Sequence, residues 1–249
     1  MVLINLKHIS FSYPSGKPVL ENLCFQLHDG EKVGLIGPNG SGKTTLFHII
    51  MGLMKPHSGK IEIFGREIND ENDFRSVRQK IGLLFQDADD QLFSPTVLED
   101  VAFGPLNQGK SVKEAKDIAG QTLSSLGLEG FENRITHKLS GGEKKLVSLA
   151  TVLAMKPKVL LLDEPTTGLD TETTERIINI LNEIDISYIF ISHNIDFIVQ
   201  TAYKIYGMIN GQISLEEEKV AHSHTHLHGY GRLPHIHSQD KQSLTNKKR

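Results

Sequence analysis

Residues 37–44, Gly37-Pro-Asn-Gly-Ser-Gly-Lys43-Thr44, decide the fold of this chain of 249 residues. They match G-x-x-x-x-G-K-[ST], with the apolar strand-like residues 32–36 before them and the apolar helical residues 46–53 after them. Glycines let the backbone fold so that its N–H groups face an anion, and a following helix adds the positive end of its dipole. Lys43 supplies a full charge and Thr44 a hydroxyl that suits Mg²⁺. This phosphate loop predicts a nucleotide site.

Two acidic residues follow a second apolar run, Val-Leu-Leu-Leu at residues 159–162. A continuous apolar run of this length is typical of a strand that is buried on both faces of a parallel sheet. Asp163 is expected to reach Mg²⁺ through water, and Glu164 to orient and deprotonate the attacking water. The alternative is a pair of solvated carboxylates that cap the strand, but acids directly after four apolar residues usually face a cation or a catalytic water.

The apolar pattern changes along the chain. Short apolar segments before residue 65 (2–6, 23–27, 32–36 and 60–64) predict a β-rich opening, whereas residues 94–157 have helical spacing. Residues 158–163 and 188–192 predict two parallel strands, and residues 172–184 the helix that crosses between them. We therefore expect an α/β fold: a phosphate-loop NTPase core with a RecA-like parallel sheet, an antiparallel β subdomain and an inserted helical subdomain.

Composition narrows the partners and the compartment. The formal charge is 27 − 30 = −3, and no basic stripe is present, so we expect no nucleic-acid partner. Cys24 is the single cysteine, so no intramolecular disulfide can form. No apolar run approaches the roughly 18 residues of a spanning helix, and the first residues lack the pattern of a secretory signal. A cytoplasmic location is expected, at the membrane only if a partner holds the chain there.

A third motif, Leu139-Ser-Gly-Gly-Glu143, stands before the apolar residues 146–155. Ser140 and the two glycines suit the first turn of a helix, where free N–H groups can face a phosphate, and Ser140 with Glu143 also forms a capping-box pattern. With this signature segment (residues 139–143), the sequence resembles the ATP-binding subunits of ATP-binding-cassette transporters over residues 1–214. Glu143 and Leu146 depart from the glutamine and arginine that are frequent there in that family.

The resemblance implies the following roles. Tyr13 would stack on adenine, Gln86 would touch Mg²⁺ and sense the membrane partner, Asp170 would lie at the dimer contact, and His193 would meet the γ-phosphate. The signature segment would face the ATP of a second ATPase subunit, either an identical copy or a paralogue. The implied catalytic residues are Glu164, His193 and Gln86, and the implied Mg²⁺ residues are Thr44, Gln86 and Asp163. The implied ATP-binding residues are Tyr13, Gly37, Pro38, Asn39, Gly40, Ser41, Gly42, Lys43, Thr44, Thr45, Ser140, Gly141 and Gly142.

The segment from Phe85 to Pro105 indicates which branch of the family the sequence resembles. It resembles the energy-coupling-factor ATPases, in particular those of cobalt and nickel importers. This implies a transmembrane coupling protein, a helix of which lies on this surface in those relatives, and a substrate-binding membrane subunit. The chain would then be a peripheral protein on the cytoplasmic face of the cell membrane. Internal packing of the helical insert (about residues 87–157) is the simpler explanation for some of its apolar residues.

The last 35 residues, 215–249, are polar and predict a flexible tail. Six of the 12 histidines of the chain fall within 16 of these residues. They are His222, His224, His226, His228, His235 and His237. Neutral imidazoles at alternating spacing can chelate nickel or cobalt without a preformed fold, although an unconstrained tail can also be histidine-rich without binding metal.

Other functions share the nucleotide motifs. The same type of ATPase could energise vitamin import, and a soluble cassette ATPase would not need the surface around residues 86–105. A phosphate-loop kinase or GTPase would leave the signature segment unexplained, and no N-K-x-D guanine motif occurs. The sequence thus favours an ATPase that drives import of nickel or cobalt.

Overall fold

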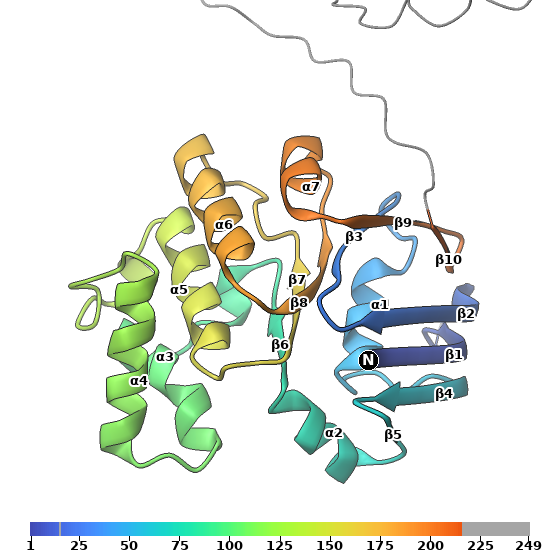
Figure 1. Cartoon of the computed structure of the whole chain (residues 1–249), viewed down its shortest axis with the longest axis horizontal. Coiled ribbons are helices and arrows are strands. Elements are labelled where there is room, and N and C mark those ends of the chain that lie inside the picture. The colour runs from blue at the N-terminus through green and yellow to red at the C-terminus, as the bar shows by residue number, and fades with distance from the viewer. Residues whose placement is uncertain (15, 216–249) are drawn as a thin grey trace, which may run out of the picture. The chain divides into compact units, whose positions relative to one another are not determined.

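The computed structural model describes residues 1–14 and 16–215, which form two sheets and their covering helices (Figure 1). The six predicted metal-binding histidines lie outside the described residues. The antiparallel sheet has the order β2-β1-β4-β5 and the other sheet the order β10-β9-β3-β8-β7-β6. The antiparallel strands are β1 (Val2–Ser12), β2 (Pro18–His28), β4 (Ser58–Ile63) and β5 (Arg66–Glu67). The second sheet contains β3 (Lys32–Ile36), β6 (Ile81–Leu84), β7 (Val159–Asp163), β8 (Ser187–Ile191), β9 (Lys204–Ile209) and β10 (Gln212–Leu215).

The second sheet is parallel except at one edge. Strand β3 pairs in parallel with both β8 and β9, and β7 pairs in parallel with both β6 and β8. Only β10 runs antiparallel, as a hairpin with β9. Because the carboxyl ends of parallel strands meet at one edge, the residues after β3, β6, β7 and β8 converge there.

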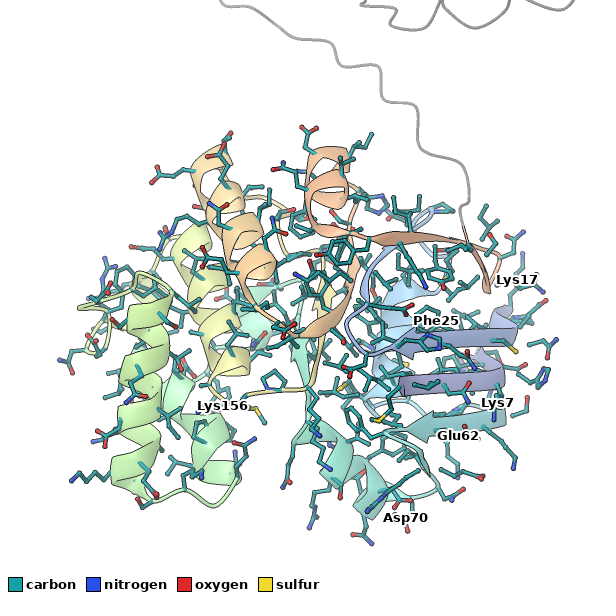
Figure 2. The ribbon with its side chains drawn as sticks, viewed as in Figure 1. Lys7, Lys17, Phe25, Glu62, Asp70 and Lys156 are labelled. Atoms are coloured by element: carbon teal, nitrogen blue, oxygen red, sulfur yellow. The ribbon has the colours of Figure 1, made fainter. Side chains whose placement is uncertain are left out.

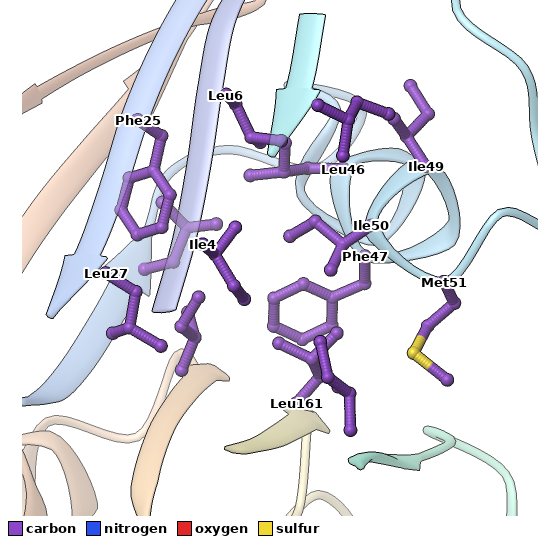
Figure 3. Close-up of a cluster of buried hydrophobic side chains, with 14 of the residues drawn as sticks. Ile4, Leu6, Phe25, Leu27, Leu46, Phe47, Ile49, Ile50, Met51 and Leu161 are labelled. Carbon is purple, nitrogen blue, oxygen red and sulfur yellow. The ribbon is translucent and has the colours of Figure 1, made fainter. Parts of the chain in front are cut away.

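Helix α1 (Lys43–Ile50) joins the two sheets. Its buried Leu46, Phe47, Ile49 and Ile50 pack in one cluster with residues of β1 and β2 on one side and Leu161 of β7 on the other (Figure 3). Phe47, Ile49 and Ile50 are fully buried. Burial of one such side chain stabilises the fold by about 1.5–3 kcal/mol. The first helix after the phosphate loop is therefore fixed by the core itself.

Strand β7 is buried on both faces, as the sequence predicts. Val159 and Leu161 belong to the cluster around α1, whereas Leu160 and Leu162 belong to a second cluster with several later helices. Figure 1 shows these helices on the side of the parallel sheet away from β1 and β2. Those that contribute to this cluster are α3 (Val97–Asn107), α4 (Val112–Ser125), α5 (Gly141–Leu153), α6 (Thr171–Glu183) and α7 (Ile195–Thr201).

The predicted fold class is confirmed, while several boundaries were wrong. β1 and β2 continue well beyond the predicted residues because bulges let them pair past the apolar stretches. Helix α1 begins at Lys43 and ends at Ile50, three residues earlier than predicted at each end. The apolar pattern did not predict β6, α7, β9, β10 or the short helix α2 (Glu71–Arg78), whose start is fixed by a capping box of Asp70 and Asp73.

The exposed face of the antiparallel sheet is charged. Figure 2 shows Lys7 and Glu62 close together there, and Lys7 Nζ lies 2.8 Å from Glu62 Oε1.

No helix of the described residues is long and apolar enough to cross a bilayer.

Candidate nucleotide-hydrolysis site

The phosphate loop connects β3 to α1 and requires glycine at two positions. Gly37 has φ +149°, and a Cβ atom there would lie 2.2 Å from the carbonyl oxygen of Met208. Gly42 has φ +105°, and its Cβ would lie 2.8 Å from Cδ2 of Leu20. Both the backbone conformation and the close approach of neighbouring strands therefore exclude a side chain.

A cavity of about 770 Å³ opens at this edge of the sheet. It brings together most of the predicted site residues, from the end of β1, the phosphate loop and the ends of β6, β7 and β8. Its lining residues are Tyr13, Val19, Asn39, Gly40, Gly42, Lys43, Thr44, Thr45, Gln86, Asp163, Glu164, Thr167, Ile191 and His193. Gly37, Pro38 and Ser41 belong to the same loop without lining the cavity, and Ser140, Gly141 and Gly142 are not part of it.

Lys43 places its ammonium at the base of the loop. Its Nζ donates hydrogen bonds to the carbonyl oxygens of Gly37 at 2.8 Å and Pro38 at 3.0 Å. Burial lowers the pKa of Lys43, and the nearby carboxylates of Glu164 and Asp163 oppose that shift. The site therefore combines one buried cation with two acids.

Asp163 has a buried oxygen atom that the protein itself does not satisfy. The residue is only 5% exposed, and its Oδ1 atom has no hydrogen-bond partner among the described residues. Burial raises the pKa of Asp163, while a hydrogen bond with Thr44 partly offsets this shift. A carboxylate, a hydroxyl and the amide of Gln86 at one cavity form an all-oxygen donor set of the kind Mg²⁺ prefers. The residues present thus fit a magnesium ion.

Glu164 is held on both sides. Its Oε2 accepts a hydrogen bond from the hydroxyl of Thr167 at 2.9 Å, and its Oε1 lies 3.4 Å from Nε2 of His193. The backbone N–H of Glu164 donates to the carbonyl oxygen of Ile191 at the end of β8. Glu164 itself has φ +45°. A non-glycine residue in this region is uncommon and is held by its surroundings. Thr167 was not predicted, although its position three residues after Glu164 could have suggested it.

Tyr13 lies at the rim of the cavity. Its hydroxyl is 3.1 Å from Oγ1 of Thr45, and its ring packs edge-to-face on Phe11 with centroids 5.1 Å apart. The residue is 41% exposed, so part of it remains accessible to a ligand. This placement is compatible with the predicted stacking on a base.

The signature segment lies at the start of α5. The hydroxyl of Ser140 accepts from the N–H of Glu143 at 3.3 Å, and the carboxylate of Glu143 accepts from the N–H of Ser140 at 2.8 Å. The predicted capping box is therefore present, while Ser140 and Gly141 remain exposed.

Asp170, the predicted dimer-contact residue, has a local role within the chain. It caps α6 by accepting from the N–H of Thr173 at 2.8 Å and from its hydroxyl at 3.0 Å. These hydrogen bonds lower the pKa of Asp170. Its side chain is exposed, and its role at the dimer contact stays a prediction.

The fold and the site define a phosphate-loop NTPase. The family model described as ABC transporter matches residues 20–167. The chain belongs to this family: it is an ATP-binding ABC transporter ATPase. An energy-coupling factor transporter ATP-binding protein, EcfA, of Methanothermobacter thermautotrophicus is 45% identical over 218 residues, which span 86% of this chain and 70% of that protein.

Solved structures agree with this assignment. The cbiO1 protein of Clostridium perfringens, part of the ABC transporter complex cbiONQ, has a TM-score of 0.76 and 34% identity, with 86% of this chain and 87% of that chain covered. A dimeric ATP-binding cassette in a post-hydrolysis state with ADP and phosphate has a TM-score of 0.78 and 29% identity, with 87% and 98% covered.

Proposed function

We propose that this ATPase energises import of a transition-metal ion, nickel or cobalt, as the peripheral subunit of an energy-coupling-factor transporter on the cytoplasmic face of the cell membrane. The observation that carries the transporter assignment is an apolar groove of about 410 Å³ beside the Gln86 segment (residues 85–91). Similarity to EcfA and to cbiO1 supports the energy-coupling-factor branch of the family. The six histidines of residues 222–237 support nickel or cobalt as the transported ion.

The apolar groove is exposed where a membrane partner would need it. Its lining includes Met51, Leu53, Leu83, Phe93, Phe103 and Met155. Phe93 is 67% exposed and Phe103 is 46% exposed, and their rings meet edge-to-face with centroids 4.8 Å apart. Aromatic side chains that remain in water next to a groove are typical of protein-docking surfaces. We assign the groove to a helix of the transmembrane coupling protein.

The hydrolysis chemistry follows from the groups around the cavity. Glu164 accepts the proton of the attacking water, while Thr167 and His193 fix the orientation of its carboxylate. Lys43 offsets negative charge on the transferred phosphate. Asp163, Thr44 and Gln86 would hold Mg²⁺, which neutralises phosphate charge when bound. Tyr13 stacks on the adenine.

A second ATPase subunit, identical or paralogous, completes the site. Ser140 and Gly141 are exposed at the positive end of α5, outside the cavity of their own chain. A Cβ atom on Gly141 would meet nothing within 4 Å, whereas one on Gly142 would lie 2.9 Å from Oγ1 of Thr173. The fold of the chain therefore requires glycine at 142 but not at 141. A partner's nucleotide that approaches Gly141 would explain that glycine.

Purification of the membrane complex tests the proposal. We expect this chain to accompany a coupling protein and a small membrane subunit that retains Ni²⁺ or Co²⁺. A retained vitamin would move the assignment to the vitamin branch. Recovery of the chain without any integral membrane protein would favour a soluble cassette ATPase.

The histidine tail has its own test. Calorimetry compares the full chain with a chain that ends at Val220. We expect Ni²⁺ binding only by the full chain, and weaker binding below about pH 6.5, because imidazolium cannot ligate a metal. Equal Ni²⁺ uptake by both chains would leave the tail without a metal role, and the ATPase assignment would be unaffected.

A further inference from the structure

Lys145 is a buried cation that the chemistry described above does not use. It lies in the second turn of α5, just after the signature segment, and is only 3% exposed. Its Nζ donates to two backbone carbonyl oxygens of the Gln86 segment, those of Phe85 at 3.1 Å and Gln86 at 2.6 Å. Within the described residues, no carboxylate lies within 4 Å of this ammonium. Neutral carbonyl groups are thus its direct partners.

Such a charge is expensive to bury, and the protein compensates for it at longer range. Burial lowers the pKa of Lys145, whereas the carboxylates of Asp163, Asp87 and Glu164 favour its charged form. Two of these acids belong to the hydrolysis site. A buried ammonium that donates to carbonyl oxygens holds those carbonyls firmly, because losing them would cost the charge its hydrogen bonds.

Other side chains hold the ends of the Gln86 segment against the same helix. Gln91 accepts from the N–H of Phe85 at 3.2 Å and donates to the carbonyl of Ser148 and the hydroxyl of Thr151, both at 2.8 Å. Lys144 pairs with Asp89 at 2.6 Å. Lys145 is the one of these three that contacts Gln86 itself.

We propose that Lys145 is a positioning residue for ATP hydrolysis. It holds the backbone of Gln86 against α5, so that the side chain of Gln86 stays at the nucleotide cavity in a fixed relation to the signature segment on the same helix. Displacement of α5 would then displace Gln86 with it. The inference rests on the proposed role of Gln86 at the magnesium site.

The test uses the full chain, three single variants at Lys145 and Gln86, and one control variant. Lys145→Met removes the charge and keeps the apolar stem, Lys145→Arg keeps the charge, and Gln86→Ala removes the group that Lys145 positions. Lys116→Met is the matched control, since Lys116 is exposed on α4. We expect kcat to fall about tenfold in Lys145→Met with the Kd for ATP within about twofold of wild type, and Lys145→Arg to restore most of the rate.

The double variant Lys145→Met/Gln86→Ala separates positioning from general stability. If Lys145 acts through Gln86, its loss should change kcat by less than about twofold once Gln86 is absent. A further tenfold loss in the Gln86→Ala background would overturn the proposal and leave Lys145 a merely structural residue. An unchanged kcat in Gln86→Ala alone would instead overturn the role of Gln86, and the positioning proposal with it.

Hydrogen exchange provides a second measurement if Lys145→Met does not fold. Lys145→Gln keeps a polar donor but removes the charge. We expect the amides of Asp87 and Ala88 to exchange faster in this variant, while those of β7 stay at the wild-type rate. Equal exchange in both proteins would contradict the proposal.

Discussion

The Nε2 atom of His193 lies 3.4 Å from Oε1 of Glu164, and these residues come just after the ends of the neighbouring strands β8 and β7. The hydroxyl of Thr167 holds the other oxygen of the same carboxylate. Glu164 therefore has little rotational freedom and presents its carboxylate to the cavity.

Glu164→Gln keeps the shape of this side chain and removes its basicity. We expect ATP binding to persist and hydrolysis to fall by at least about 100-fold. Because ATP is then not consumed, we expect an ATP-bound dimer of two chains to accumulate. Gel filtration with ATP and a phosphate-release assay measure both effects. Glu175→Gln, an exposed change on α6, is the control. Unimpaired turnover in Glu164→Gln would refute the general-base assignment.

Asp163→Asn should raise the melting temperature of the nucleotide-free, metal-free protein. Because burial raises the pKa of Asp163 in the folded state, folding loses stability as the pH rises from the ordinary aspartate value of 3.8 through the folded-state pKa, and the full loss persists above it. A neutral amide lacks this effect, so we expect a gain of a few degrees at pH 8. The gain should shrink as the pH falls from the raised folded-state pKa toward the ordinary aspartate value of 3.8, and should vanish well below 3.8, where the carboxyl is protonated in both the folded and the unfolded state. Thermal melts of both proteins across this pH range provide the measurement. An equal gain in melting temperature at every pH would contradict the prediction.

Gly141→Asp tests whether a second chain uses the start of α5. The new side chain has open space in its own chain, so the melting temperature and ATP binding should stay near wild type. Its negative charge should repel the partner's nucleotide and lower hydrolysis by at least about 100-fold. Gly120→Asp on α4, where a Cβ also has open space, should keep full activity. Normal hydrolysis by Gly141→Asp would show that no phosphate approaches this residue.

Phe93→Asp tests the apolar groove. The ring is exposed, so we expect the isolated chain to keep its fold and its ATP binding while co-purification with the membrane subunits is lost. Val112→Asp, a similarly exposed apolar site at the start of α4, is the control. Unchanged recovery of the complex would remove the groove from the docking surface.

The sequence was most informative where one residue type meets one physical requirement. The glycines at 37 and 42 locate the phosphate loop, and the acids directly after four apolar residues locate the end of β7. The placement of Lys145 could not be predicted in this way, because a lysine in a helical pattern is usually exposed, and its carbonyl partners lie about sixty positions earlier in the chain. β10 has only one residue that is even partly buried, so its apolar alternation is too weak to identify a strand.

The capping box at α5 also determines the direction of the Ser140 hydroxyl. Its oxygen already accepts the N–H of Glu143, and the hydroxyl also interacts with the Glu143 carboxylate, whose pKa it helps to lower, so donation to an incoming anion requires the hydroxyl hydrogen to turn away from that carboxylate. An aspartate would cap the helix equally well but would offer no hydrogen and would add a negative charge. At this position, folding is satisfied by several residue types, whereas donation to an incoming anion is satisfied by a hydroxyl. Selection on the two tasks can therefore be distinguished at a single side chain.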